Sequence, residues 1–214
     1  MDTNTDHLRP PQASFILSGL GKMFPEGRVT IGALMDALGD AGLGILLIVF
    51  ALPSFIPTPG LPVGFVSGTV VALIALQVMA GRHTLWLPDR LRNFSLPASI
   101  LVKGAAYLAK PMRFFERWLK PRYSQFTGKT ARMFLALPIL ILAISSVLPI
   151  PLGNQAPSIA LIAFGFGLIE RDGLAILVAI ILSVVAMAWL TFVIIFGVEA
   201  ISFGTAYVAS VLGW

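Results

Sequence analysis

Residues 133–169 read MFLALPILILAISSVLPIPLGNQAPSIALIAFGFGLI, a stretch without Asp, Glu, Lys, Arg or His. Residues 41–81 and 173–198 also lack all five residue types. Uncharged apolar runs of this length are typical of membrane-spanning segments, because crossing about 30 Å of hydrocarbon takes roughly 20 helical residues. The alternation of apolar and polar residues that marks barrel strands is missing, so we predict an all-α integral membrane protein.

Composition supports the same class. The chain has 214 residues, of which 57% are hydrophobic and only 12% are charged, and its mean hydropathy is +0.90. The absence of Cys excludes disulfides, thiolate catalysis and Cys-ligated metals. The polar N-terminal tail, residues 1–26, lacks the apolar core and cleavage site of a signal peptide, so we expect no removable leader.

Basic residues are concentrated between two of the apolar runs. Eleven of the fifteen Lys and Arg residues fall between Arg82 and Arg132, where Asp89 and Glu116 are the only acids. Short loops rich in Lys and Arg stay on the cytoplasmic side, so this linker is predicted to be cytoplasmic. Nucleic-acid binding is disfavoured as an explanation, because apolar runs flank the basic segment on both sides.

Residues 100–120 of the linker are predicted to form an amphipathic helix lying in the membrane interface. At about 100° per residue five basic side chains share one face, aromatic side chains flank it, and the opposite face is apolar. The predicted lipid-binding residues are Lys103, Lys110, Arg113, Arg117 and Lys120. This face would bind anionic lipid of the cytoplasmic leaflet. Packing of the helix on the protein's own cytoplasmic surface is the open alternative.

Proline-rich segments interrupt the first two apolar runs, at residues 53–62 and 148–157, and we call these segments the tips of two helical hairpins. Proline removes a backbone donor and biases the preceding residue away from helix, so the tips should be irregular. The arms of the second hairpin, residues 133–148 and 157–169, would reach only about 20–24 Å. Re-entrant hairpins therefore fit better than full spans, although tilting and local thinning keep spans open.

The two hairpins resemble copies of each other. Pro57-Thr58-Pro59 in the first tip matches Pro149-Ile150-Pro151 in the second. Proline-interrupted apolar segments in two halves of a chain indicate a transporter-like site at a repeat interface. A linker that does not cross the membrane makes the repeat parallel rather than inverted.

The last apolar run, residues 174–198, is predicted to be one tilted transmembrane helix, followed by an interfacial tail with Tyr207 and Trp214 as anchors. The predicted organisation is a tail (1–26), a first hairpin with a preceding short helix (27–88), a basic linker (89–132), a second hairpin (133–172), and the transmembrane helix with its tail (173–214). The short helix, residues 30–40, carries Asp36 and Asp40, which are expected to pair with linker arginines.

Polar side chains near the tips are the candidates for a central site. They are uncharged, and Gln77 is expected to take a comparable part. The site residues are Ser54, Pro57, Thr58, Pro59, Ser145, Ser146, Pro149, Pro151, Asn154 and Gln155. Intramembrane polar groups often line pathways, but hydrogen bonds that pack helices together explain them equally well.

Charged residues mark the hairpin ends at Arg82, Glu170, Arg171 and Asp172, for which a salt-bridged surface turn is the simplest interpretation. No spacing of His residues suits a metal, and no nucleophile motif or glycine-rich phosphate loop is present. We therefore expect neither an enzyme nor a metal or other cofactor. Gly60, Gly64 and Gly68 permit close helix contact, either within the chain or in a homo-oligomer.

With these residues in view, the chain resembles the exopolysaccharide synthesis protein ExoD family of bacterial inner-membrane proteins. The resemblance runs from about Gly27 to Trp189 and depends on the order of several short motifs rather than on any one. These are residues 38–42 (LGDAG), 51–53 (ALP), 81–82 (GR), 86–88 (WLP), 148–154 (LPIPLGN) and 167–173 (GLIERDG). Thr58 departs from the family's aliphatic first tip. The resemblance implies a role in exopolysaccharide production, without a molecular activity to transfer residue by residue.

Three functions are compatible with these features. The first is a transporter-like or channel-like inner-membrane protein for polysaccharide synthesis or export, with the tips as its site. The second is a non-catalytic assembly factor whose basic linker recruits lipid or proteins of the export machinery. The third, less favoured, is an enzyme acting on a lipid-linked sugar.

Overall fold

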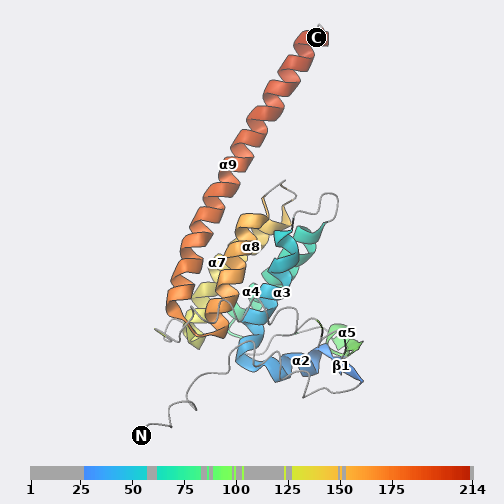
Figure 1. Ribbon diagram of the computed structural model, residues 1–214, viewed down its shortest axis with the longest axis vertical. Coiled ribbons are helices and arrows are strands. Elements are labelled where there is room, and N and C mark those ends of the chain that lie inside the picture. The colour runs from blue at the N-terminus through green and yellow to red at the C-terminus, as the bar shows by residue number, and fades with distance from the viewer. Residues whose placement is uncertain are drawn as a thin grey trace.

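The computed structural model describes residues 27–56, 62–82, 86, 89–97, 99, 103, 123, 127–148, 150 and 153–212. Four apolar helices form its centre (Figure 1). Helices α3 (Gly42–Phe55) and α4 (Val63–Met79) make one hairpin, and α7 (Lys129–Val147) and α8 (Gln155–Ile169) make the other. Helix lies on both sides of each predicted tip, and it extends into them, since residues 53–55 belong to α3 and residues 155–157 to α8.

The two hairpins pack against each other in a crossed pairing. Helix α3 lies along α8, and α4 lies along α7. The first arm of each hairpin therefore contacts the second arm of the other. Both hairpins turn at the same end of the bundle, which we call the tip end (Figure 1). The opposite end, where α4 and α8 finish and α7 begins, is called the charged end.

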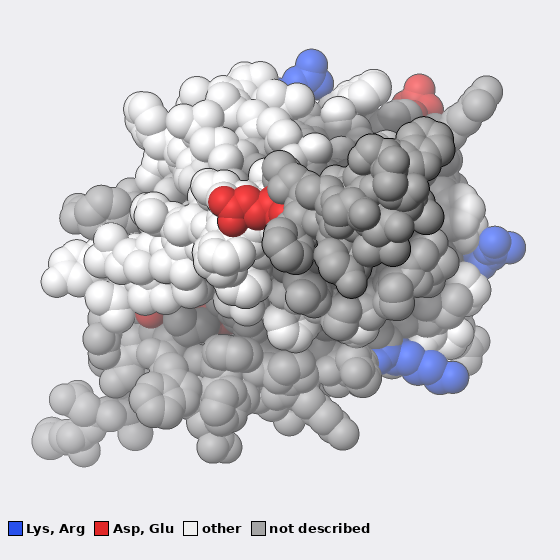
Figure 2. Space-filling view, turned by 90° about the horizontal axis from the view of Figure 1, so that it is seen from above, with Lys and Arg blue, Asp and Glu red and all other residues white. Residues whose placement is uncertain are grey.

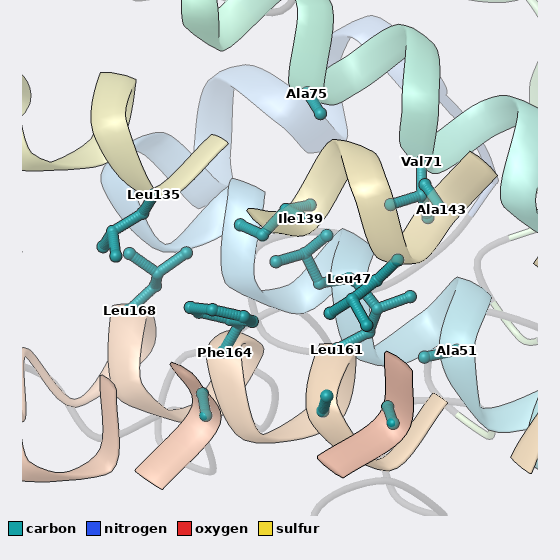
Figure 3. Close-up of a cluster of buried hydrophobic side chains, with 14 of the residues drawn as sticks. Leu47, Ala51, Val71, Ala75, Leu135, Ile139, Ala143, Leu161, Phe164 and Leu168 are labelled. Atoms are coloured by element: carbon teal, nitrogen blue, oxygen red, sulfur yellow. The ribbon is translucent and has the colours of Figure 1, made fainter. Parts of the chain in front are cut away.

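Side chains from all four helices fill the space between them (Figure 3). Leu47 of α3, Val71 of α4, Leu142 of α7 and Phe164 of α8 are buried, and Phe164 is 0% exposed. Small residues let the helices approach closely where they pair. A Cβ on Gly44 would stand 2.5 Å from the carbonyl oxygen of Gly165, so α3 and α8 touch backbone to backbone.

The outer surface of the bundle is apolar. Large hydrophobic side chains point away from the core on several helices, among them Phe65, Leu73, Phe134, Ile141, Ile144, Leu177, Val184 and Phe196. Figure 2, seen from the tip end, shows a described surface that is mostly uncharged, with Lys and Arg only at its outline. Contiguous apolar surface of this kind is rare on monomeric soluble proteins.

Helix α9 (Gly173–Leu212) packs on α8 and then continues past the tip end (Figure 1). Its 40 residues give a length of about 60 Å at 1.5 Å per residue. The helix does not stop at residue 198, where the predicted span ends, because residues 199–212 contain no proline to break it. The interfacial placement of residues 200–214 stays a prediction.

Two helices in the described part of the chain are long and apolar enough to cross a membrane. They are α7, over Thr130–Val147, and α9, over Gly173–Gly197. The incoming arm of the second hairpin, α7, is longer than the sequence predicted, and the choice between a re-entrant and a spanning hairpin stays a prediction. The predicted arm was counted from Met133, whereas the helix begins at Lys129 and carries Lys129 and Arg132 in its first turn. The returning arm, α8, is short as expected, with 15 residues.

A small structure joins the start of the described chain to the linker at the charged end. Strands β1 (Arg28–Thr30) and β2 (Ser95–Pro97) pair antiparallel, with Val29 opposite Leu96. The all-α prediction therefore missed one short ribbon, because three-residue strands carry no readable alternation. Helix α2 (Ile31–Leu38) and the 3₁₀ turn η2 (Gly39–Ala41) confirm the short helix that precedes the first hairpin.

An ion pair connects α2 to the linker helix α5 (Asp89–Arg92). A guanidinium nitrogen of Arg92 lies 3.1 Å from a carboxylate oxygen of Asp36, which confirms the predicted pairing of Asp36 with a linker arginine. Gly32 allows the approach, since a Cβ there would stand 2.6 Å from the Arg92 side chain. Most of the predicted amphipathic helix, residues 100–120, lies outside the described residues.

Candidate functional site

At the end of α7 a main-chain carbonyl loses its helical donor and faces the other hairpin. In a continuing helix the N–H of Ile150 would donate to the carbonyl of Ser146. It donates instead to the carbonyl of Leu148, at 2.8 Å. Pro149 and Pro151 have no N–H to replace it. The proline-rich sequence therefore removes the donor that the Ser146 carbonyl has in a regular helix.

Gly64, in the first turn of α4, lies against this acceptor. A Cβ on Gly64 would stand 2.8 Å from the Ser146 carbonyl oxygen and 2.9 Å from the side-chain amide carbon of Asn154. The amide nitrogen of Asn154 lies closer still to the position that this Cβ would occupy. Only glycine allows such an approach without displacing its neighbours, so the two hairpins meet at their tips.

Two amide oxygens beside this contact are buried without partners. Among the side chains that the structure describes, the buried polar atoms lacking a hydrogen bond are Asn154 Oδ1 and Gln155 Oε1. Leaving a buried acceptor unpaired costs about 1–3 kcal/mol. Asn154 is the N-cap residue of α8, a position where Asn normally accepts a backbone N–H, yet its side chain makes no capping bond.

We call Gly64, the Ser146 carbonyl, Asn154 and Gln155 the tip cluster. Its oxygens accept hydrogen bonds and carry no charge, and residues 41–81 and 133–169 contain no ionisable side chain near them. Neutral amides neither transfer protons near pH 7 nor act as nucleophiles. The cluster is therefore chemically suited to holding a neutral hydrogen-bond donor.

The serine hydroxyls predicted for the site are used inside their own helices. Ser54 donates to the carbonyl of Phe50 at 3.4 Å, and Ser145 and Ser146 both donate to the carbonyl of Leu142, at 2.7 and 3.0 Å. All three serines are buried. These hydroxyls therefore make hydrogen bonds within their helices and do not line a site. The group of Ser146 that faces Gly64 is its main-chain carbonyl.

Other predicted site residues lie outside the described residues. In the tips these are Pro57, Thr58, Pro59, Pro149 and Pro151, and in the linker they are Lys110, Arg113, Arg117 and Lys120. Lys103 is described and is exposed. Gln77, expected to act with the tip residues, is instead at the charged end, where its Oε1 accepts the backbone N–H of Trp86 at 2.6 Å. Its position near the end of α4 explains this, since the tip precedes that helix.

The charged end has its polar groups paired and partly buried. Glu170 is 6% exposed and Asp172 is 2% exposed, so these two acids of the predicted salt-bridged turn are buried rather than on the surface. Asp172 Oδ1 accepts the N–H groups of Leu174 (2.9 Å) and Ala175 (3.4 Å) and so caps α9. Arg171 turns the chain with a φ of 51°, and the N–H of Arg82 donates to the Gln77 carbonyl.

Among the described residues, no three His, Cys, Asp or Glu side chains gather as metal ligands. Sequence reasoning missed the close contact of Gly44 with Gly165 and the pairing of Gly64 with Asn154. The spacing of Gly64 and Gly68 was the available signal. The structure shows that both face α7 of the same chain, since a Cβ on Gly68 would stand 2.6 Å from the Ala143 carbonyl oxygen.

Comparison with known proteins adds the family. The model of the family "Exopolysaccharide synthesis, ExoD" matches residues 13–192. The chain is 31% identical over 168 residues to Protein ExoD of Rhizobium meliloti (strain 1021), covering 75% of this chain and 68% of that protein. It is also 31% identical over 169 residues to the uncharacterized protein slr1875 of Synechocystis sp., covering 75% of this chain and 78% of that one. No solved structure matches. The chain belongs to the exopolysaccharide synthesis ExoD family.

Proposed function

We propose that this protein is a multi-pass protein of the bacterial inner membrane that supports exopolysaccharide synthesis or export as a transporter-like or channel-like component. The exopolysaccharide part of the proposal rests on the family, whose description is exopolysaccharide synthesis. The single observation that carries the mechanism is the tip cluster, where two proline-broken hairpins meet around unpaired neutral acceptors.

The apolar outer surface supports the membrane part of the proposal. Only 22% of the apolar stretch of α9 and 39% of that of α7 is buried within the protein. A core helix of a soluble protein would be mostly buried, whereas a helix in contact with lipid exposes its apolar side chains without cost. The long hydrophobic side chains on the outside of the bundle are then lipid contacts.

The arrangement of the hairpins supports the proposed topology. In this topology the basic linker lies on the cytoplasmic leaflet, and both hairpins enter from that side as a parallel repeat. Both tips lie at one end of the bundle, and exchange of the hairpins preserves the pairing of α3 with α8 and of α4 with α7. The arms of 14 to 19 residues are about 21–28 Å long and would bring the tips deep into the bilayer.

We further propose that the protein is not an enzyme. An enzyme acting by side-chain chemistry needs an acid, base or nucleophile at its site, and the tip cluster supplies only neutral amide and carbonyl groups. Substrate handling by binding and conformational change suits such groups better.

The test is complementation in an exopolysaccharide-producing bacterium whose own family member is deleted. Wild type, Asn154→Leu, Gln155→Met and the control Thr69→Val are expressed to equal membrane levels. Thr69 is a suitable control because it is half-buried on α4 and its hydroxyl donates to the Phe65 carbonyl of its own helix. Secreted polysaccharide and lipid-linked precursor are both measured.

We expect wild type and Thr69→Val to restore secretion, and the two amide variants to restore less than a tenth of it while precursor accumulates. Normal secretion by both amide variants would contradict a transport site at the tips. If, in addition, secretion were lost on neutralising Arg82, Arg90 and Arg92 of the basic segment, the assembly-factor function would replace the proposed one.

A further inference from the structure

The tip cluster combines several acceptors with few donors, and this imbalance indicates its ligand. Asn154 Oδ1 and Gln155 Oε1 are buried and unpaired, and the Ser146 carbonyl has lost its helical donor to Leu148. The Ser146 carbonyl oxygen and the Asn154 side-chain amide both lie next to the position that a Cβ on Gly64 would occupy. The neighbouring hydroxyls of Ser145, Ser146 and Ser158 donate to carbonyls of their own helices, so they do not supply the missing hydrogens.

We infer that the tip cluster binds hydroxyl groups of a neutral saccharide segment through the side-chain amides of Asn154 and Gln155. This inference rests on the proposed function and adds the chemical class of its ligand. A sugar hydroxyl donates one hydrogen bond and accepts others, and an amide offers both an acceptor oxygen and a donor NH₂ group. Two adjacent amides therefore match a pair of hydroxyls on one sugar ring.

The charge of the cluster distinguishes this ligand from ions. An anion would face acceptor oxygens and no basic side chain in residues 41–81 or 133–169. A divalent cation would face no carboxylate in the same segments, although Ca²⁺ and Mg²⁺ sites in proteins are usually built with carboxylates. A neutral donor needs no counter-charge, so it is the ligand class that these residues favour.

Relief of the unpaired acceptors also explains why two amides are kept in apolar surroundings. Buried polar groups without partners are a cost in the free protein that a ligand can remove when it binds. An apolar side chain of the same size would lower that cost but could not hold a hydroxyl. Binding and stability in the absence of ligand are therefore expected to respond to substitution in opposite directions.

The experiment uses the full chain purified in lipid nanodiscs, and the readout is the thermal unfolding midpoint. The probes are neutral malto- and cello-oligosaccharides of four to six units, each titrated against wild type, Asn154→Leu, Gln155→Met and Thr69→Val. Sodium, potassium and magnesium chloride are titrated separately, with choline chloride holding the ionic strength constant.

We expect at least one saccharide series to raise the midpoint of wild type and Thr69→Val in a saturable way. Asn154→Leu and Gln155→Met should each raise the half-saturating concentration at least about tenfold, the ratio that corresponds to the loss of one hydrogen bond of about 1.4 kcal/mol. Their midpoints without saccharide should equal or exceed that of wild type.

Three results would overturn the inference. They are a saturable shift by a metal cation with none by saccharide, identical saccharide titrations for all four proteins, and amide variants that melt well below wild type without ligand. The last would mean that the amides hold the fold together, with structural water as their partner. Failure here is separable from failure of the proposed function. Amide variants that stop secretion without changing saccharide titration refute only the inference, whereas variants that weaken binding and secrete normally refute the transport role.

Discussion

The tip end and the charged end of the bundle differ in how their polar groups are satisfied. At the charged end Asp172 accepts two backbone N–H groups, Gln77 accepts one, and Arg92 pairs with Asp36. At the tip end Asn154 and Gln155 keep buried oxygens without partners. A sequence selected for stability alone would satisfy both ends. Local conflict of this kind is expected where a protein binds something, so the difference supports the binding site that we propose at the tip end.

The largest expected effect is on the contact between the tips. Gly64→Val should lower the free energy of unfolding by about 3 kcal/mol, because its side chain would collide with the Ser146 carbonyl and the Asn154 amide. Unfolding in detergent, followed by circular dichroism, measures it. Gly197→Val is the matched control, since a Cβ at Gly197 meets nothing within 4 Å. Equal stability of the two variants would mean that the tips do not touch.

A smaller loss is expected at the charged end. Asp172→Ala should lower the free energy of unfolding by about 1–2 kcal/mol. The substitution removes the carboxylate that caps α9, and Asp172 is only 2% exposed. Asp172→Asn, which keeps an acceptor oxygen, should lose less than half as much. The same unfolding measurement on Asn154→Leu should show no loss. If both ends lost stability equally, the contrast between them would be wrong.

The smallest effect is expected for the ion pair between α2 and α5. Arg92→Ala and Asp36→Ala should each change stability by at most about 0.5 kcal/mol, since both side chains are more than half exposed, at 52% and 64%. Raising the salt concentration should remove even this difference. A double-mutant cycle in low and high salt measures it, and a coupling much above that value would show that the pair holds the linker in place.

Several features were predictable from short stretches of sequence. The uncharged runs predicted where the apolar helices lie, and the prolines predicted where both tips lie. The arginines of the basic linker were predicted as partners of Asp36. The unpaired amides were also singled out, because Asn154 and Gln155 are the only side chains of their kind at the second tip. The length of α7 was underestimated, because charged residues at Lys129 and Arg132 were taken as boundaries although a helix tolerates them in its first turn.

Composition and local pattern determined that the chain is helical, apolar and interrupted at two proline-rich tips, because these properties depend on near neighbours along the chain. Only the tertiary structure decided that α3 lies on α8, that Gly64 meets Asn154, and that Glu170 and Asp172 are buried. It also decided that the serine hydroxyls bond within their own helices while two amide oxygens stay unpaired. Those facts depend on which surfaces pack together, and residues far apart in sequence determine that jointly.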